Sequence, residues 1–209
     1  MLLVIGNKNY SSWSLRPWIA LKVFDFAFDE KRIPLDRAAT KEEILRHSPA
    51  GKVPVLVDGQ TTVWDSLAIL EYLAEKNPRL WPSNAAERAR ARVISAEMHS
   101  GFPQLRNHMS MNVRKRYPGK GCTAEVAMEI QRILEIWNAA KKPFLFGPFS
   151  AADAMYAPVV LRFRTYEVEL PNACRAYADA MLALPAMREW IEAAEREPES
   201  IAQLDRQHE

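Results

Sequence analysis

Cysteine is scarce in this chain, which has only Cys122 and Cys174 among its 209 residues. The two form no cluster with the spacing of metal ligands, and they indicate no disulfide framework. The chain therefore carries no metal motif, and a reducing, cytoplasmic environment is expected.

An excess of charge of one sign is also missing, because 28 basic residues are balanced by 26 acidic residues, for a net charge of +2. This balance gives no indication of a nucleic-acid or anionic-membrane partner. The opening Met1–Ile5 is too short for the apolar part of a signal peptide, and no apolar run reaches the length of a membrane-spanning helix. With 48% hydrophobic residues and no internal repeat, the chain can build one or two packed domains.

One stretch has a clear pattern of secondary structure. A strand, a turn, a second strand and a helix are predicted over residues 50–75, AGKVPVLVDGQTTVWDSLAILEYLAE. Val53–Val57 is short, apolar and β-branched, and Asp58-Gly59 is a tight hairpin signal. Thr61–Trp64 predicts the second strand, and the apolar period that starts at Asp65-Ser66 predicts the helix.

The start of this helix has the groups needed to bind an amino acid. A helix N-terminus offers free N–H groups and a partial positive charge for a carboxylate, while the Asp65 carboxylate can hold an ammonium group. The alternative is that Asp65 or Ser66 only caps the helix. Pro54 begins its strand, where a missing N–H costs little, and the peptide bond before it can adopt the cis form.

G-K-V-P-V-L followed by D-S-L-A-I-L-E-Y-L resembles the glutathione-binding half of a cytosolic glutathione S-transferase. The resemblance implies that Val53, before a cis Pro54, pairs its backbone with the cysteinyl part of glutathione. It also implies that Asp65 and Ser66 hold the γ-glutamyl end. Lys52 is either a ligand of a glutathione carboxylate or a solvated lysine.

A polar loop over residues 7–14 contains three serines and separates an apolar strand, Leu2–Gly6, from an amphipathic helix, Leu15–Phe26. The serines can cap this helix or point at a ligand above its N-terminus. Both interpretations place them where the strand meets the helix.

The sequence S-S-W-S-L-R-P-W-I-A-L resembles the serine-type transferases, in which a serine five residues before an arginine donates a hydrogen bond to the glutathione sulfur. Ser11 stands five residues before Arg16 and is the first candidate. Ser12 is the second, because a shift of one residue is within the error of such an alignment. Tyr10 is a rival donor, but it and Trp13 are expected to line the pocket. The thiolate is the attacking species, and a hydroxyl donor and a helix N-terminus both favour the anion.

The remaining N-terminal elements are a strand over Ala27–Leu35, which Pro34 indicates to be an edge strand, and a short helix over Lys41–His47. This order of elements is that of the thioredoxin-like domain with a mixed four-stranded sheet that the resemblance implies. The expected glutathione S-transferase fold has this α/β domain over 1–77, a proline-containing linker over 78–85, and an all-α domain over 86–209.

The all-α domain is predicted from helical periods with no strand pattern. Its expected helices cover residues 86–116 (bent near Pro103), 123–140, 171–184 and 185–196. Ser150 and Asp153 have the spacing of a capping box, which resembles the motif at the start of the central buried helix of the transferase α-domain. The basic run Arg114-Lys115-Arg116 is predicted to be solvated at a helix end.

The long helix after the linker is expected to bind the second substrate, because it faces the cleft in the resembled fold. Five of its residues recur at helical spacing: Met98, His99, Phe102, Arg106 and Met109. Some of them would line the substrate pocket and the others the core. His99 is either an acid–base group or a partly exposed histidine.

The resemblance covers nearly the whole chain. It implies a homodimeric glutathione transferase in which glutathione, as co-substrate, attacks a small hydrophobic electrophile that the sequence does not name. One alternative is a zeta-like maleylacetoacetate isomerase, although its usual S-S-C-S motif reads S-S-W-S here, with Trp13 in place of cysteine. The other is a non-catalytic transferase-like module that binds partners or hydrophobic ligands, against which the retained glutathione-site residues argue.

Overall fold

The computed structural model describes residues 1–208. Its four strands form one mixed sheet in the order β2-β1-β3-β4. The strands are β1 (Leu2–Ile5), β2 (Asp29–Arg32), β3 (Val55–Asp58) and β4 (Thr61–Val63). β1 pairs parallel to β2 and antiparallel to β3, and β3 pairs antiparallel to β4. The mixed four-stranded sheet and the edge position of β2 are thereby confirmed.

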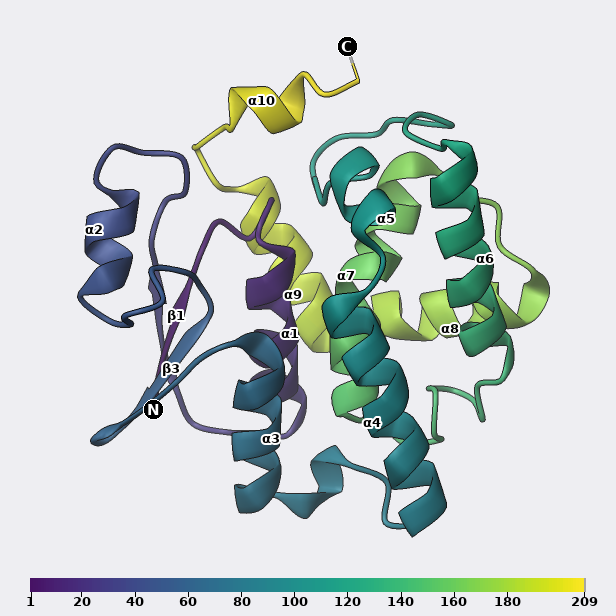
Figure 1. Cartoon of the computed structure of the whole chain (residues 1–209), viewed down its shortest axis with the longest axis horizontal. Helices are drawn as coiled ribbons and strands as arrows, with labels where there is room; N and C mark the ends of the chain where they lie inside the picture. Colours follow the sequence, from purple (N-terminus) through teal and green to yellow (C-terminus); the bar gives the residue numbers. More distant parts are fainter. Residues whose placement is uncertain (209) are drawn as a thin grey trace.

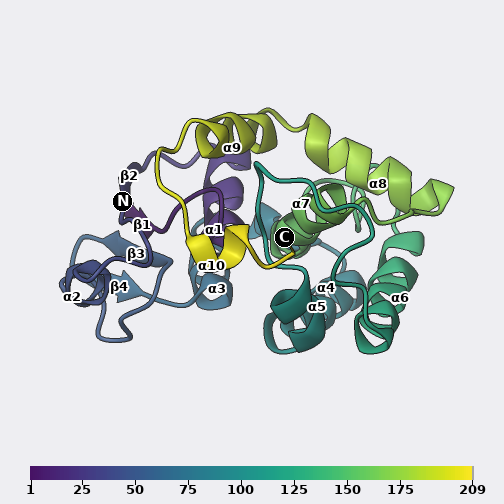
Figure 2. The same cartoon turned by 90° about the horizontal axis from the view of Figure 1, so that it is seen from above.

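The alternation of side chains along β1 distributes the helices over the two faces of the sheet. Leu3 and Ile5 enter the main core with α1 (Ser12–Val23) and α3 (Ser66–Lys76), which pack against each other. Val4 points to the other face, where it packs with Ile44 of α2 (Thr40–Leu45). Figure 2 shows α2 on the side of the sheet opposite to α1 and α3.

The second half of the described chain is helical. The turn η1 (Pro78–Leu80) leads to helices α4 (Ala85–Ser100), α5 (Pro103–His108), α6 (Ala124–Asn138), α7 (Ala151–Tyr166), α8 (Asn172–Ala183), α9 (Pro185–Glu195) and α10 (Ala202–Asp205). Every residue of α7 except Arg164 is buried, and α7 packs against α1, α4 and α8. It joins the two halves of the molecule (Figure 1). The domain boundaries given above stay a prediction.

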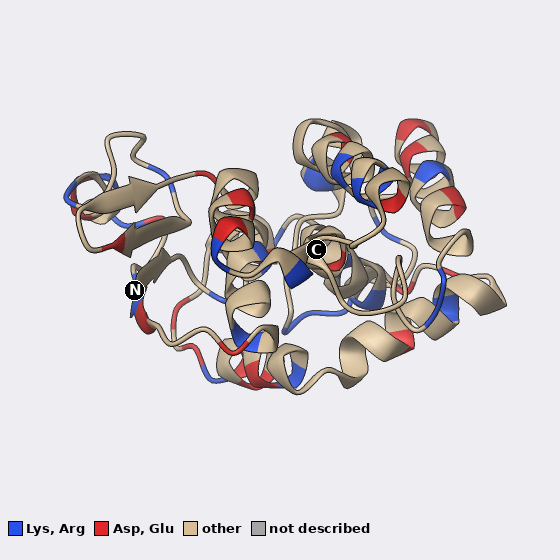
Figure 3. Cartoon of the chain, turned by 90° about the horizontal axis from the view of Figure 1, so that it is seen from below, with Lys and Arg blue, Asp and Glu red and all other residues tan. Residues whose placement is uncertain are grey.

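Lysines and arginines alternate with aspartates and glutamates over both halves of the molecule (Figure 3). This distribution agrees with the near-neutral net charge. Among residues 1–208, no helix is both long and apolar enough to cross a membrane.

The expectation of one long helix over residues 86–116 is wrong. α4 ends before Gly101, which is extended at φ −93° and ψ −171°, and Phe102 adopts a left-handed conformation at φ 59°. Pro103 then begins α5, where its missing N–H leaves no helical bond unmade. α5 is short, and residues 109–123 form neither helix nor strand.

Arg114 therefore lies in an irregular segment rather than at a helix end, and it is not solvated as predicted. Its guanidinium donates to the carbonyl oxygens of Glu197 (2.6 Å) and Glu199 (2.7 Å) and to the Tyr10 hydroxyl (2.9 Å). Arg114 of the basic run thus links the 109–123 segment by hydrogen bonds to the C-terminal tail, which we define as residues 196–208.

The capping box at the start of α7 is confirmed. Asp153 is fully buried, and its carboxylate accepts hydrogen bonds from the backbone N–H of Leu145 (2.9 Å) and Ser150 (2.8 Å) and from the Ser150 hydroxyl (2.8 Å). Burial raises the pKa of the Asp153 carboxyl to about 6, against the opposing effect of these donors. The bonds fix the loop before α7 to the helix on which both halves of the molecule pack.

Ser150→Ala and Asp153→Ala should therefore each lower the free energy of unfolding, by about 0.5–2 kcal/mol for a lost cap and by more for Asp153, which also holds Leu145. Urea denaturation monitors the change. Ser100→Ala, at an exposed position of α4, is the control and should stay within about 0.5 kcal/mol of the parent. Turnover per folded molecule should be unchanged, and a lower turnover at full stability would show that these residues belong to the active site.

Candidate active site

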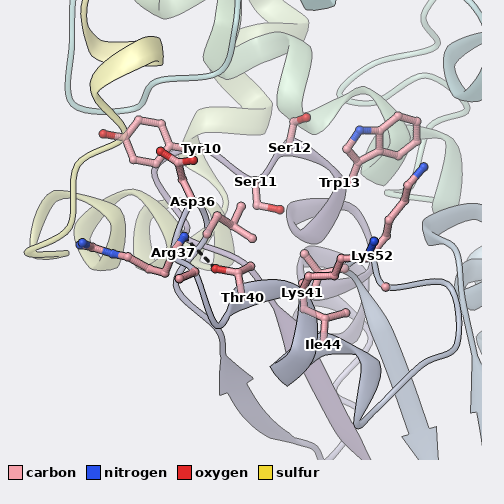
Figure 4. Close-up of a pocket in the computed structure, with 14 residues that line it drawn as sticks. Tyr10, Ser11, Ser12, Trp13, Asp36, Arg37, Thr40, Lys41, Ile44 and Lys52 are labelled. Atoms are coloured by element: carbon pink, nitrogen blue, oxygen red, sulfur yellow. Dashed lines mark hydrogen bonds between the residues drawn. The ribbon is translucent and has the colours of Figure 1, made fainter.

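A cavity of about 720 Å³ opens between α2 and the polar segment of residues 7–14, which we call the serine loop (Figure 4). Its lining comes from three separate parts of the chain: Tyr10, Ser11, Ser12 and Trp13 after β1; Leu35, Asp36, Arg37, Ala38, Thr40, Lys41 and Ile44 around α2; and Gly51, Lys52 and Val53 before β3. The fold thus brings the serine loop and the residues before Pro54 to one site.

A second cavity, of about 390 Å³, adjoins the first and shares Trp13, Lys52 and Val53 with it. Its other lining residues are Ala50, Pro54, Trp64, Asp65 and His99. The peptide bonds before Pro54 and Asp65 are both cis. The two adjoining cavities are thus lined by Ser11, Val53 and Asp65, the residues predicted for the sulfur, the cysteinyl part and the γ-glutamyl end of glutathione.

Ser11 is the N-cap residue of α1, yet its side chain makes no capping hydrogen bond. Its hydroxyl oxygen lies 2.7 Å from the hydroxyl oxygen of Ser14, and the side chain points into the cavity in Figure 4. The alternative that this serine only caps the helix therefore does not describe its side chain.

Ser12 is the first residue of α1, and its hydroxyl oxygen accepts a hydrogen bond from Arg162 of α7 at 3.2 Å. Figure 4 shows its hydroxyl on the side away from Thr40 and Lys41, unlike that of Ser11. The two candidate donors thus differ in direction: Ser11 faces the space between the loop and α2, and Ser12 faces the helical domain.

The Tyr10 hydroxyl points away from Ser11 (Figure 4). It donates to the carboxylate of Asp205 at 2.9 Å and accepts hydrogen bonds from Arg114 (2.9 Å) and from the backbone N–H of Ile201 (3.1 Å). With these partners, the hydroxyl is engaged by the C-terminal tail. Tyr10 lines the cavity with its ring, as predicted, and its hydroxyl is not directed at the cavity.

The C-terminal tail also holds the backbone of the serine loop, a contact that no motif in the sequence predicts. The carboxylate of Glu197 is 5% exposed and accepts hydrogen bonds from the backbone N–H groups of Lys8 (2.6 Å) and Asn9 (3.1 Å). Trp190 donates its indole N–H to the carbonyl of Lys8 at 3.0 Å. Nothing in the sequence near Glu197 marks it as a partner of a loop at the other end of the chain.

Three cationic side chains, Arg37, Lys41 and Lys52, line the first cavity. Arg37 precedes α2 and Lys41 lies in its first turn, a region for which the sequence predicts only a short helix. Asp36 is the acidic residue of the same lining. The cavity is therefore suited to an anionic group on the side opposite to the serine loop.

Asp65 both caps α3 and reaches the second cavity. One carboxylate oxygen accepts hydrogen bonds from the backbone N–H of Leu67 (3.1 Å) and Ala68 (3.4 Å). The other lies 3.0 Å from Nε2 of His99, and the side chain is 51% exposed. Ser66, next to it, is buried and accepts a hydrogen bond from Arg16 at 3.3 Å. Both roles considered for Asp65 are thus compatible with its position.

His99 lies at this end of the site rather than next to the serines. Its ring stands edge-on to Trp13, with 5.3 Å between the ring centroids. Its Nδ1 is buried, and no hydrogen-bond partner for it is found within residues 1–208. The residue expected on the substrate side therefore pairs with Asp65.

The other expected residues of α4 and α5 lie behind the site. Met98, Phe102 and Met109 are buried in the main core and line neither cavity. Arg106 donates to the carbonyl oxygens of Met98 and Gly101 at the end of α4, and its guanidinium lies over the Trp13 ring at 4.9 Å. Arg106 is thus a cap of α4 that touches the site through Trp13.

The half-buried Arg106 lies with the buried Arg16 and Arg162 in a group of three arginines behind Ser12 and Trp13. Arg16 lies over the Trp13 ring at 4.2 Å, and Arg162 bridges Ser12 and the carbonyl of Met109. Burial, with repulsion from the other two arginines, lowers the pKa of Arg16, and burial with repulsion from Arg106 lowers that of Arg162 to about 10. Within the described residues, none of the three forms an ion pair, although attraction by Asp65 partly offsets the lowered pKa of Arg16, and attraction by Glu129 that of Arg106.

Residues 10–76 match the glutathione S-transferase N-terminal domain, and residues 120–193 match the glutathione S-transferase C-terminal domain. The chain is 30% identical over 207 residues to the maleylacetoacetate isomerase of Rattus norvegicus, a match that covers 94% of each chain. It is also 40% identical over 103 residues to a probable maleylacetoacetate isomerase of Caenorhabditis elegans, which covers 48% of this chain and 47% of the relative.

Among solved structures, the chain resembles a sphingomonad glutathione S-transferase complexed with glutathione. The TM-score is 0.66 at 25% identity, covering 94% of this chain and 100% of the other. The protein belongs to the glutathione S-transferase family, with its mixed-sheet N-terminal domain and its helical second domain. The resemblance found in the motifs is thereby confirmed for both halves of the chain.

Proposed function

We propose that this protein is a glutathione-dependent cis–trans isomerase that acts on a small enone or enedione. The observation that carries the proposal is the 30% identity to a maleylacetoacetate isomerase over 94% of both chains. From the sequence alone, a conjugating transferase is the first hypothesis and an isomerase the alternative. The identity to the isomerase makes isomerisation the first hypothesis.

Glutathione has an ammonium and a carboxylate at its γ-glutamyl end, a thiol in the middle and a second carboxylate at its glycyl end. We assign the γ-glutamyl end to Asp65 and to the N-terminus of α3 at Ser66, with His99 as a further neighbour. The backbone of Val53 would pair with the cysteinyl part. Lys52, Lys41 of α2 and Arg37 just before α2 would then bind the glycyl carboxylate.

With these ends in place, the sulfur would lie at the serine loop. Ser11 would donate a hydrogen bond to the thiolate, and the N-terminus of α1 would add its partial positive charge. The buried arginines behind Ser12 would contribute a further positive potential, which is weakly screened in a low-dielectric interior. Each of these effects lowers the pKa of the bound thiol.

In the isomerisation, the thiolate would add to one carbon of the cis double bond, and the π electrons would move onto the conjugated carbonyl as an enolate. The former double bond is then single and can rotate. When the enolate re-forms the double bond, it expels the thiolate and leaves the trans product. Glutathione is regenerated, so it is not consumed by the reaction.

This stoichiometry distinguishes isomerisation from conjugation. With maleylacetoacetate in large excess over glutathione, we expect many turnovers for each glutathione present, and no loss of free thiol. Product formation is followed by ultraviolet absorbance and the thiol by titration. A reaction that stops when one glutathione has been used for each product formed would contradict the proposal and identify a conjugating transferase.

Conjugation remains the second candidate because of Trp13. The motif of the resembled isomerases has cysteine at this position, and here the tryptophan ring lines both cavities. An aryl halide in the same thiol assay tests this candidate. Retention on glutathione-agarose with no turnover of either substrate would favour the non-catalytic module instead.

The homodimer and the cytoplasmic location stay predictions. Sedimentation velocity at micromolar concentration measures the oligomeric state.

Asp65→Asn isolates the charge of the γ-glutamyl site, because asparagine is an equally good N-cap for α3. The ammonium of glutathione would lose its charged partner, which is worth about 1.5–3 kcal/mol, so the KM for glutathione should rise about 10- to 150-fold. Asp179→Asn, at an exposed position of α8, is the control and should leave this KM unchanged. An unaltered KM in folded Asp65→Asn would exclude the proposed role.

Ser11→Ala should raise the pKa of enzyme-bound glutathione by about one to two units, since one hydrogen bond to an anion is worth about 1.5–3 kcal/mol. Turnover should fall near neutral pH, and the deficit should shrink as pH rises through the new pKa and the thiolate forms unaided. Absorbance of the bound thiolate against pH measures the shift. If Ser12→Ala carries the larger shift, the donor is Ser12 and the assignment is one residue out.

A further inference from the structure

Ser14 is a buried serine beside the serine proposed to hold the sulfur. Its side chain is fully buried, in the first turn of α1. Its hydroxyl oxygen lies 3.1 Å from the backbone nitrogen of Gly6 and 2.7 Å from the hydroxyl oxygen of Ser11. These are the two hydrogen-bond partners that the described residues offer it.

The direction of the Ser11–Ser14 hydrogen bond follows from where the protons can go. The Gly6 nitrogen can only donate, so the Ser14 oxygen accepts from it. If Ser11 also donated to Ser14, the hydroxyl proton of the fully buried Ser14 would be left without an acceptor, which buried donors avoid. The arrangement that satisfies every group has Ser14 donating to Ser11.

This direction determines what Ser11 can offer a ligand. Once its oxygen accepts from Ser14, its own hydroxyl proton is free to be donated to a ligand. The side chain faces the cavity in Figure 4. Each bond in the chain from Gly6 through Ser14 to Ser11 also polarises the next, which makes the last hydroxyl a better donor.

We propose that Ser14 is a positioning residue, which turns the hydroxyl proton of Ser11 toward the sulfur of bound glutathione. This inference rests on the proposed function, since it requires glutathione at the serine loop. Ser14 does not touch the sulfur in this arrangement; it acts only through Ser11. The Ser12 oxygen also accepts a hydrogen bond, from the Arg162 guanidinium, but its hydroxyl lies on the side of the helical domain rather than facing the space between the loop and α2.

The test is the pKa of enzyme-bound glutathione, read from thiolate absorbance against pH, in Ser14→Ala. We expect a rise of about 0.5–1 unit, which is about 3- to 10-fold less thiolate below the pKa. The dissociation constant for glutathione should change less than twofold. Ser95→Ala removes another fully buried serine hydroxyl, one without a partner in the described chain, and should leave the pKa unchanged.

Ser14→Thr keeps the hydroxyl and should return the pKa to within a few tenths of the parent value. If the alanine variant does not fold, Ser14→Cys nearly preserves the side-chain volume and replaces the hydroxyl by a weak donor. It should show the same rise in pKa. A parental pKa in the folded alanine or cysteine variant would overturn the proposal.

The double variant Ser11→Ala/Ser14→Ala separates this inference from the function on which it rests. If Ser14 acts only through Ser11, its removal should add nothing to the shift already caused by Ser11→Ala. A further shift in the double variant would overturn the positioning role while leaving Ser11 as the donor. An unshifted pKa in Ser11→Ala alone would overturn the proposed donor, and with it the role of Ser14.

Discussion

The site depends on the hydrogen bonds from the backbone of the serine loop to the buried carboxylate of Glu197. A polar loop between a strand and a helix has N–H groups that its own segment leaves unpaired, and in a buried position each would carry a desolvation cost. Glu197 accepts from two of them, at Lys8 and Asn9. The position of Ser11, two residues further on, therefore depends on a residue near the other end of the chain.

The same tail binds the loop a second time through side chains. Asp205 accepts from Tyr10 and from Asn112, and Arg114 reaches from the irregular segment to the Tyr10 hydroxyl. The tail and the 109–123 segment, far apart in sequence, thus meet at the loop. A ligand at Ser11 encounters a prepared geometry, which reduces the ordering that binding would otherwise require.

Local patterns in the sequence predict the parts of this structure that depend on neighbouring residues. The hairpin at Asp58-Gly59, the cap at Asp65 and the capping box at Ser150 each follow from a few adjacent residues, and the structure contains all three. Near Pro103 the sequence predicts only a bend, because the helical period continues through Gly101, whereas in the structure the helix ends there. The position of such a break is decided by packing rather than by propensity.

Contacts between distant segments could not be predicted in the same way. The pairing of Glu197 with the serine loop, and of His99 with Asp65, requires the relative placement of elements that no spacing in the sequence encodes. Arg162 is another example, since a long charged residue in a helix is ordinarily exposed. Its burial against Ser12 becomes visible only when α7 is packed on α1.

The packing of the arginines gives a physical reason for Trp13, the residue that departs from the motif of the resembled isomerases. Arg16 and Arg106 approach its ring to 4.2 and 4.9 Å, and neither has a carboxylate partner in the described chain. A cation over an indole face gains electrostatic stabilisation, more so when both are removed from water. A cysteine there would have no such face. The buried Arg16 would then rely on the Ser66 hydroxyl and the Met98 carbonyl, and the half-buried Arg106 on carbonyl oxygens. Trp13 and the unpaired arginines are thus one arrangement, which leaves positive charge behind the serine loop and a broad apolar ring at the mouth of the site.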